Sequence, residues 1–483
     1  MPEFLQEVGD FSASSISPVF LLSILVFLSA AYYLRRHPKN KKGLRLPPSP
    51  PRLPLIGNLH QLSALLTAPS ESFPGNTAPD ATSPRADPHS RGLIRGGGAG
   101  GAQDPGPRLR HQALLRRRRR PHQSLRNVSF APYGEHWRQG KKAAVVHLLS
   151  PNKVQSLRRT REEERDLYAF SNGFVCRVVA GSSAAREVRT QRFREAIDGA
   201  TALLSGPRLE ELFPSLAWVT KLPGADSRLK KLAKKWNALL DEIVAEHERR
   251  AGKREEAEEV DFIDLLLSAD PADLIAAGTD TSYVVLEWAM AELLKNPALL
   301  ERTQREVREA AGGKPAPTED DVASMPRLRA VVKEVLRLHM PAPLLIPREA
   351  MEATRVLGYD VPAGTRVFIN AWAMATDPEW WEAPEEFRPE RFLREEKAAP
   401  PADLRGSDFQ FLPFGAGRRM CPGMNFALCE VELALASLLY CFDWSLPDGA
   451  APEGLDMAES PGITVRRKTP LRLIAVPNSA VLA

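Results

Sequence analysis

A single cysteine near the C-terminus stands in a setting suited to binding a metal as a thiolate. Cys421 follows the stretch 411–420, which holds two glycines and two arginines, and precedes Pro422 and Gly423. Glycine permits backbone conformations that other residues resist, and proline is tolerated where a helix begins. The apolar run 426–439 continues at helical spacing, so the thiolate would face the positive end of a helix dipole. Such a thiolate suits the axial position of a haem iron. The simpler interpretation, a half-buried cysteine in a glycine turn, does not account for this spacing.

An acid and an alcohol lie side by side in a second stretch of the chain. Asp280 and Thr281 follow Gly278 inside an apolar helical pattern that ends at residues 296–297. Neighbouring carboxyl and hydroxyl groups can relay protons, as general acids do. A glycine inside a helix costs about 1 kcal/mol against alanine, and it marks a place where another group approaches the backbone closely. The alternative is a helix N-cap, because threonine and aspartate are both good caps. On spacing alone the two interpretations are even.

Two opposite charges occur on a further predicted helix that is largely apolar. Glu334 and Arg337 are three residues apart, and side chains at that spacing are neighbours on a helix. A solvated surface pair is the usual explanation for such a pattern. A buried pair would need additional partners to offset its desolvation, and Arg391 in the stretch 387–392 could supply one. The apolar surroundings favour the buried pair.

An amphipathic helix is predicted to begin near residues 132–138, with an indole and a guanidinium at its start. Trp137 and Arg138 could each donate hydrogen bonds to a carboxylate, and haem carries two carboxylates. The alternative for a Trp–Arg pair is a cation–π contact at the surface.

These four motifs occur in the order that is typical of the cytochrome P450 family, the haem-thiolate monooxygenases. The chain resembles this family from about Phe130 to Val476, and its details are similar to plant microsomal members of the A type. The resemblance implies a mainly α fold with a small β region. It implies that Cys421 ligates the iron of haem b, that Phe414 and Gly423 belong to its binding loop, and that Asp280 and Thr281 deliver protons. It further implies propionate contacts from Trp137, Arg138, Arg348 and Arg419, and a structural cluster behind the haem formed by Glu334, Arg337 and Arg391.

The N-terminal region predicts a membrane-anchored protein. The apolar run 16–34 is about long enough to cross a bilayer, and basic residues follow it while acidic residues precede it. The positive-inside bias places the rest of the chain in the cytosol. A cleaved signal peptide would carry its positive charge first and have a shorter core. The predicted organisation is a membrane anchor (1–35), a proline-rich hinge (36–59), an aberrant low-complexity segment (60–126) and the haem-thiolate domain (127–483).

The segment 60–126 departs from the family pattern. It is rich in Ser, Pro, Ala, Gly and Arg, includes the arginine run 116–120, and shows neither strand alternation nor a helical stripe. We interpret it as disordered, with the family's N-terminal helix and sheet region disrupted. Out-of-frame or mis-spliced translation is our hypothesis for its origin. A charged disordered tract is a commoner explanation for the arginines than nucleic-acid binding, and no nucleic-acid partner is predicted.

A second departure precedes the acid–alcohol pair, where the family has a long helix over its substrate pocket. Pro271 permits a helix to begin but not to run through. The haem site is therefore better preserved in sequence than the substrate site. Elsewhere the pattern predicts amphipathic helices over 229–250 and 299–311 and a strand-rich region over 351–370, with turns at Gly358 and Gly364.

The composition is compatible with one large domain: 483 residues with 43% hydrophobic content can bury a large core. Four cysteines show neither metal-ligand pairing nor a disulfide framework. By resemblance, we expect a monooxygenase on the endoplasmic reticulum membrane, single-pass and with its catalytic domain in the cytosol, that receives electrons from NADPH through a reductase and acts on a small apolar substrate. A haem-thiolate isomerase or dehydratase would not need the acid–alcohol pair. A defective family member, frameshifted or truncated, with weak or no haem binding, is the other alternative.

Overall fold

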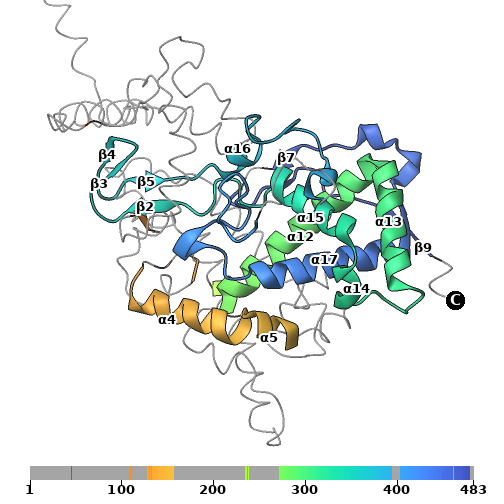
Figure 1. Cartoon of the computed structure of the whole chain (residues 1–483), viewed down its shortest axis with the longest axis horizontal. Helices are drawn as coiled ribbons and strands as arrows, with labels where there is room; N and C mark the ends of the chain where they lie inside the picture. Colours follow the sequence, from red (N-terminus) through yellow and green to blue (C-terminus); the bar gives the residue numbers. More distant parts are fainter. Residues whose placement is uncertain are drawn as a thin grey trace, which may run out of the picture.

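The part of the chain that can be described is mainly helical, with several short strands (Figure 1). A computed structural model describes residues 45, 109–110, 128–129, 131, 133–156, 234–235, 238, 271–393, 403–460 and 462–478. The predicted anchor (1–35) lies outside the described residues, as does the hinge apart from Arg45. Of the segment 60–126 only Leu109 and Arg110 are described. The prediction of a mainly α protein with a small β region is confirmed.

Four helices build the core that carries the candidate site. They are α12 (Pro271–Lys295), α13 (Pro297–Ala311), α15 (Pro326–Leu338) and α17 (Met424–Cys441). Of these, α13 and α15 begin at a proline, whose missing N–H is one of those left unpaired at a helix start. Figure 1 shows α17 passing beside α12 and between α13 and α14, and buried side chains from α12, α13, α15 and α17 form one apolar cluster.

The sequence pattern explains which helices are central. α12 and α17 are apolar on most sides over their buried stretches, whereas α13 and α15 carry one apolar stripe. Among the described residues, α17 alone is long and apolar enough to cross a membrane, but most of it is buried against α12 and α13. It is therefore a core helix. Pro271 is the first described residue of α12. The helix predicted over 299–311 is confirmed.

Shorter helices surround this core. An amphipathic helix begins where the sequence predicts one, and it continues through a π-helical turn into a third helical piece. These pieces and the remaining helices are α4 (Glu135–Ala143), η3 (Ala144–Leu148), α5 (Pro151–Ser156), α14 (Glu319–Ala323), α16 (Ala371–Ala375), η6 (Pro389–Phe392), η7 (Gly417–Arg419), η8 (Pro447–Gly449) and η9 (Pro452–Gly454). Of the helix predicted over 229–250, residues 234–235 and 238 are described, and they are helical.

The strands pair antiparallel in four small sheets. A three-stranded sheet has the order β1-β2-β5, and the three two-stranded sheets are β3-β4, β6-β9 and β7-β8. Their bounds are β1 (Leu109–Arg110), β2 (Arg348–Ala350), β3 (Thr354–Val356), β4 (Tyr359–Val361), β5 (Arg366–Val367), β6 (Phe442–Ser445), β7 (Glu459–Ser460), β8 (Arg466–Arg467) and β9 (Ile474–Pro477). The strand-rich region predicted over 351–370 is confirmed, with Gly358 (φ 79°) and Gly364 (φ 78°) at its turns.

One strand corrects the sequence analysis. β1 lies inside the segment 60–126, in which no strand is predicted, and it pairs with β2 in the register Leu109↔Ala350 and Arg110↔Glu349. Two residues are too few to show an alternating pattern, and the partner strand lies far away in sequence. Pairing with β2 therefore defines this strand, and no local signal could have predicted it.

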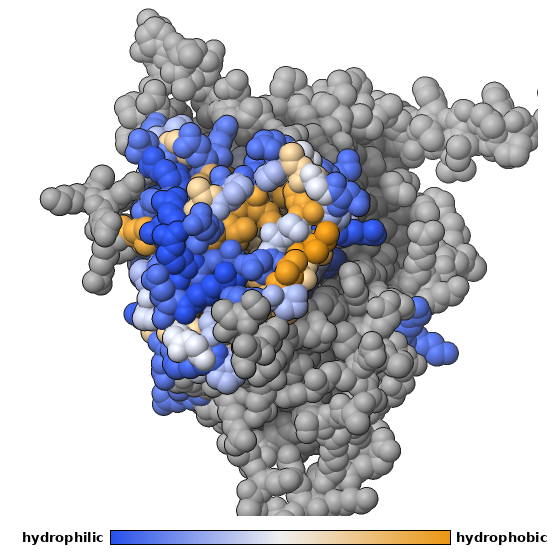
Figure 2. Space-filling model, turned by 90° about the vertical axis from the view of Figure 1, so that its right-hand side faces the viewer, coloured by the Kyte–Doolittle hydropathy of each residue, from blue (hydrophilic) through white to orange (hydrophobic). Residues whose placement is uncertain are grey.

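On the side of the molecule that carries α13 and β9, the polar face of the amphipathic helix α13 is exposed to solvent. Figure 2 shows mostly hydrophilic side chains on the described part of this surface, with apolar side chains gathered in one area. Two of the exposed apolar residues of β9 are Ile474 and Val476. The charged face of α13 thus points to solvent, while its apolar face packs on α17.

Candidate functional site

The segment 411–423, which we call the cysteine loop, folds back on itself and leads into α17. Gly415 and Gly417 both have φ of 67°, the left-handed region that favours glycine. The Cys421 N–H donates to the Phe414 carbonyl at 2.9 Å, and the Met420 N–H donates to the Gly417 carbonyl at 3.1 Å. These two bonds close the turn ahead of the helix. The thiol of Cys421 is thereby held at the edge of a cavity.

A glycine that the sequence analysis does not single out supports this loop from outside. Gly406 has φ of 74°, and a Cβ at this position would lie 2.7 Å from the Gly415 carbonyl oxygen. Any side chain would therefore displace the loop backbone. The only sequence signal is a lone glycine in a polar stretch, which is too common to interpret.

Opposing influences act on the Cys421 thiol. Burial among protein atoms raises the pKa of Cys421, while a hydrogen bond from the Gly423 N–H and the positive charge of Lys141 lower it. The thiol is nevertheless accessible, because it faces the cavity. Gly423 is the N-cap of α17, so its N–H belongs to the positive end of that helix. Burial is the larger influence, so the pKa of Cys421 is raised overall, and the backbone N–H and the cation offset only part of this rise.

The cavity beside Cys421 is enclosed by residues far apart in sequence and is mainly apolar. Its described walls come mainly from α4, α12, α15, α17, the loop 341–348 and the cysteine loop. The α12 wall consists of residues spaced at i, i+1, i+4, i+5 and i+8, which is one face of the helix: Ala277, Gly278, Thr281, Ser282 and Val285. Thr281 of the acid–alcohol pair and Cys421 therefore line the same space.

The structure decides between the two interpretations of the acid–alcohol pair. Asp280 and Thr281 lie inside α12, which is helical from Pro271 onward, so the N-cap interpretation is wrong. Thr281 lines the cavity, and its Oγ1 donates to the Ala277 carbonyl at 2.7 Å. Asp280 is not among the lining residues, and its carboxylate forms an ion pair with Arg466 of β8. Only the alcohol of the pair is therefore at the cavity surface.

Three cations line the cavity, and the described lining residues include no carboxylate. Arg348 is buried, which lowers its pKa to about 10, and within the described part of the chain its Nε has no hydrogen-bond partner. Arg419 Nη2 donates to the Ala131 carbonyl at 2.9 Å. Lys141 Nζ donates to the carbonyls of Arg418 and Met420 at 2.6 and 3.3 Å. A buried guanidinium without a counter-charge is costly, and a ligand that carries carboxylates would offset this cost.

These residues fit a haem group. A thiol that can ligate iron, apolar walls and an excess of positive charge match the three chemical features of haem: its iron, its macrocycle and its two carboxylates. Cys421, Arg348, Arg419 and Lys141 are the side chains suited to hold it. Phe414 also lines the cavity, and its carbonyl accepts the Cys421 N–H.

Two of the predicted propionate contacts need correction. Trp137 lines the cavity, but its indole N–H donates to the Val128 carbonyl at 2.9 Å, so it is not directed at a ligand. Its ring instead supports the Arg419 guanidinium, which lies 4.0 Å from the ring centroid. Arg138 is exposed, does not line the cavity, and pairs with Glu135 at 2.5 Å. A residue next to Trp137 on a helix faces about 100° away from it, which explains the difference.

Lys141 is the functional residue that the sequence analysis missed. It lies four residues after Trp137 on α4 and therefore on the same helix face. Burial and the charge of Arg419 lower its pKa, while Cys421 raises it. Strict use of the i, i+4 rule from Trp137 would have identified this position in place of Arg138.

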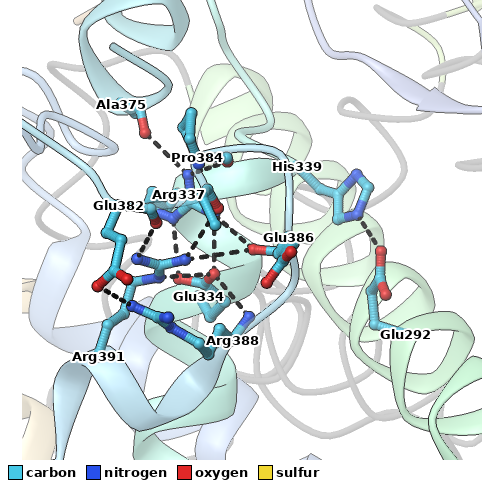
Figure 3. A network of polar contacts seen from close by, with 11 residues as sticks. Glu292, Glu334, Arg337, His339, Ala375, Glu382, Pro384, Glu386, Arg388 and Arg391 are labelled. Carbon is cyan, nitrogen blue, oxygen red and sulfur yellow. Dashed lines mark hydrogen bonds and ion pairs between the residues drawn. The ribbon is translucent and has the colours of Figure 1, made fainter. Parts of the chain in front are cut away.

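One buried network joins the charged trio of Glu334, Arg337 and Arg391 (Figure 3). Arg337 uses all five of its N–H groups: two bonds go to Glu334 at 2.8 and 2.9 Å, and three go to the carbonyls of Ala375, Pro384 and Glu386. Glu334 also accepts from the Arg388 backbone N–H at 2.9 Å and from Arg391 Nε at 3.0 Å. Both charges are fully buried and fully hydrogen-bonded. The surface-pair alternative is therefore wrong, and α15 is fixed to the segment 375–391.

A second buried contact joins the end of α15 to α12. His339 Nε2 lies 2.7 Å from Glu292 Oε1 (Figure 3). The imidazole also stacks on Trp288, with ring centroids 3.9 Å apart. The chain after His339 continues into Pro341 and Ala342, which line the cavity. His339, at the C-terminal end of α15, thus holds the start of the loop 341–348 (the cavity loop) close to α12.

Comparison with known proteins places this site in a family. A family model described as Cytochrome P450 matches residues 108–473. This match begins upstream of Phe130, where the sequence analysis places the start of the resemblance. Curated plant relatives include Cytochrome P450 71A6 of Nepeta racemosa, which is 36% identical over 95% of this chain and 99% of the relative. Strychnine-11-hydroxylase of Strychnos nux-vomica is 36% identical over 95% of this chain and 96% of the relative. A solved zebrafish cytochrome P450 with abiraterone superimposes with a TM-score of 0.56 at 27% identity, covering 74% of this chain and 85% of that chain.

Proposed function

The chain belongs to the cytochrome P450 family of monooxygenases, and from this premise we propose that it inserts one oxygen atom of O₂ into a small apolar substrate. Electrons would come from NADPH through a reductase. The observation that supports this proposal is the Cys421 thiol, which shares an apolar, positively charged cavity with Thr281 of α12. A thiol ligand on one wall and an alcohol on α12 are the two groups that this chemistry requires of the protein.

Each side chain has a distinct task in this proposal. Haem bound through Cys421 would supply the oxygen chemistry. Arg348, Arg419 and Lys141 would bind its carboxylates and so fix its orientation. Thr281 would hold a proton at its Oγ1 at the cavity surface, and Asp280 would resupply it. Apolar residues such as Val285 and Phe426 would contact the substrate and exclude water.

We place the protein on the endoplasmic reticulum membrane, with its catalytic domain in the cytosol. The anchor lies in the sequence 1–35, outside the described residues. Arg45 of the hinge is described, and its N–H donates to Asp360 Oδ2 while its carbonyl accepts the Asp360 N–H, both at 2.7 Å. The chain that leaves the anchor is therefore attached to β4 of the catalytic domain.

The proposal is tested by the spectrum of the reduced, carbon monoxide-bound full chain in microsomes. A strongly red-shifted Soret band is expected, because a thiolate donates electron density to the iron. A band at the position of a haem with a neutral axial ligand, or no band, would favour a defective family member. A red-shifted band without any NADPH-dependent consumption of O₂ would favour an isomerase or dehydratase.

Replacing Arg348 with methionine is expected to weaken haem retention by about tenfold or more, because a buried charge-assisted contact to a carboxylate would be lost. The measurement is the rate of haem transfer from the full chain to apomyoglobin. Arg366→Met is the matched control, since Arg366 lies on the neighbouring strand β5 and is exposed. Equal rates for both variants would show that Arg348 does not contact haem.

Thr281→Ala is expected to lower the fraction of O₂ that is cleaved by roughly 100-fold, the usual contribution of a positioned proton donor. The readout is hydrogen peroxide released per NADPH oxidised, which should rise. Thr303→Ala is the matched control, because Thr303 makes the same bond to the carbonyl four residues back, at 2.7 Å, in α13. Thr303 does not line the cavity. Peroxide release that is unchanged by Thr281→Ala would remove Thr281 from the mechanism.

A further inference from the structure

Asp280 is held by an arginine that is 186 residues further along the chain. Arg466 lies on β8, and its Nη2 donates to Asp280 Oδ1. The Arg466 side chain is 26% exposed and that of Asp280 is 10% exposed. Arg466 therefore lies on the solvent side of the acid, whereas Thr281, the next residue, faces the cavity. The Asp280 carboxylate is thus held away from the cavity, where the proposed reaction would need its proton.

The strand that carries Arg466 is fixed on both sides of this residue. Before it, the N–H of the buried Val465 donates to the carbonyl of Pro341, a cavity-lining residue, at 2.9 Å. After it, the guanidinium of the buried Arg467 lies 5.2 Å from the ring centroid of Trp288 on α12. The backbone at Arg466 is thus tied to the cavity loop and to α12. Arg466 itself is partly exposed, whereas the Asp280 side chain is largely buried, so solvent screens this ion pair less than it would screen a surface pair.

We propose that Arg466 is a positioning residue for oxygen activation: it holds the Asp280 carboxylate on the solvent side of α12 between proton transfers. This role rests on the proposed monooxygenase function. Asp280 takes up a proton from solvent, leaves Arg466 because the neutral acid no longer forms an ion pair, and gives the proton to Thr281 at the cavity. The carboxylate that results returns to Arg466. Each cycle moves one proton from solvent to the cavity and leaves both side chains unchanged.

The test needs no substrate, because O₂ is then reduced to hydrogen peroxide or to water. Peroxide takes up two electrons and two protons per O₂, and water formation takes up four of each and requires that the O–O bond be cleaved. We expect Arg466→Gln in the full chain, reconstituted with a reductase, to raise the ratio of peroxide to water about tenfold, the effect of losing a hydrogen bond between charged groups. Arg466→Lys should restore most of the wild-type ratio, since it keeps the charge.

Two comparisons separate this role from a general effect of charge or of folding. Lys468→Gln removes an exposed positive charge two residues away and should leave the ratio unchanged. In an Asp280→Asn background, Arg466→Gln should have no further effect on the ratio, because the carboxylate that Arg466 positions is already absent. Hydrogen exchange at the amides of β8, which does not depend on activity, should rise to the same extent in Arg466→Gln, in Asp280→Asn and in the double variant.

The outcomes are distinguishable. An unchanged ratio in Arg466→Gln, an equal effect of Lys468→Gln, or additive effects of Arg466→Gln and Asp280→Asn would each overturn the role of Arg466 while the wild type still consumes O₂. A wild type that consumes no O₂ with NADPH would overturn the proposed function and this role with it. The exchange measurement would even then show whether the ion pair exists.

Discussion

Replacing Cys421 with serine is expected to abolish the red-shifted Soret band and to reduce oxygenation to background. The thiol lines the cavity, receives the Gly423 N–H and lies near the charge of Lys141; these two contacts offset part of the burial that raises its pKa, and bonding to iron would supply the rest. A serine hydroxyl has nearly the same shape but stays protonated and donates little electron density to iron. The push that favours O–O cleavage would therefore be lost even if haem still entered the cavity.

The measurement is the spectrum of the reduced, carbon monoxide-bound variant, together with its haem content. Cys429→Ser is the matched control, because Cys429 lies on α17 as well, is half-buried and does not line the cavity. This control should keep the red-shifted band. A red-shifted band in Cys421→Ser would contradict the assignment of the axial ligand.

Arg337→Leu is expected to destabilise the protein by about 3–5 kcal/mol, because it leaves the buried Glu334 carboxylate without its main counter-charge. Three carbonyl groups, those of Ala375, Pro384 and Glu386, would lose their donor as well. This loss is a large share of the roughly 5–15 kcal/mol that stabilises a typical domain. We expect the variant to accumulate poorly and to unfold at lower urea concentration, as followed by tryptophan fluorescence.

A surface pair of the same chemistry provides the control. Arg305 pairs with Glu301 at 2.7 Å on α13, and both side chains are more than half exposed. Arg305→Leu should change stability by only a few tenths of a kcal/mol. In addition, the double variant Glu334→Leu/Arg337→Leu should be more stable than the sum of the two single losses predicts, because neither charge is then left buried alone. Equal effects of Arg337→Leu and Arg305→Leu would show that burial of the network contributes nothing.

The elements that position the site could be predicted because their sequence patterns are long and local. The course of α12, α13, α15 and α17 follows from helical periodicity and prolines. The buried Glu334–Arg337 pair could be inferred from its apolar surroundings. Its carbonyl acceptors could not, because they come from irregular segments 38 to 49 residues away.

The sequence-based predictions were wrong or incomplete where the outcome depends on the direction of a side chain or on pairing with a distant segment. Arg138 was the nearest cation to Trp137 in sequence, yet Lys141 shares its helix face and reaches the cavity. Strand β1 depends on a partner 240 residues away, and the Asp280–Arg466 pair has no local signature either. Gly406 is required only because the Gly415 backbone approaches it. None of these features leaves a periodic trace in the sequence.

The buried charge of Arg348 links the stability of this protein in the cell to its supply of haem. A chain without haem keeps a buried guanidinium whose Nε is unsatisfied among the described residues, and this lowers the stability of that form. A ligand that binds only the folded chain shifts the equilibrium toward it by mass action. Newly synthesised chains that fail to acquire haem would thus spend more time unfolded and be degraded sooner. We expect the steady-state amount of the protein to follow haem biosynthesis, with no change in its messenger RNA.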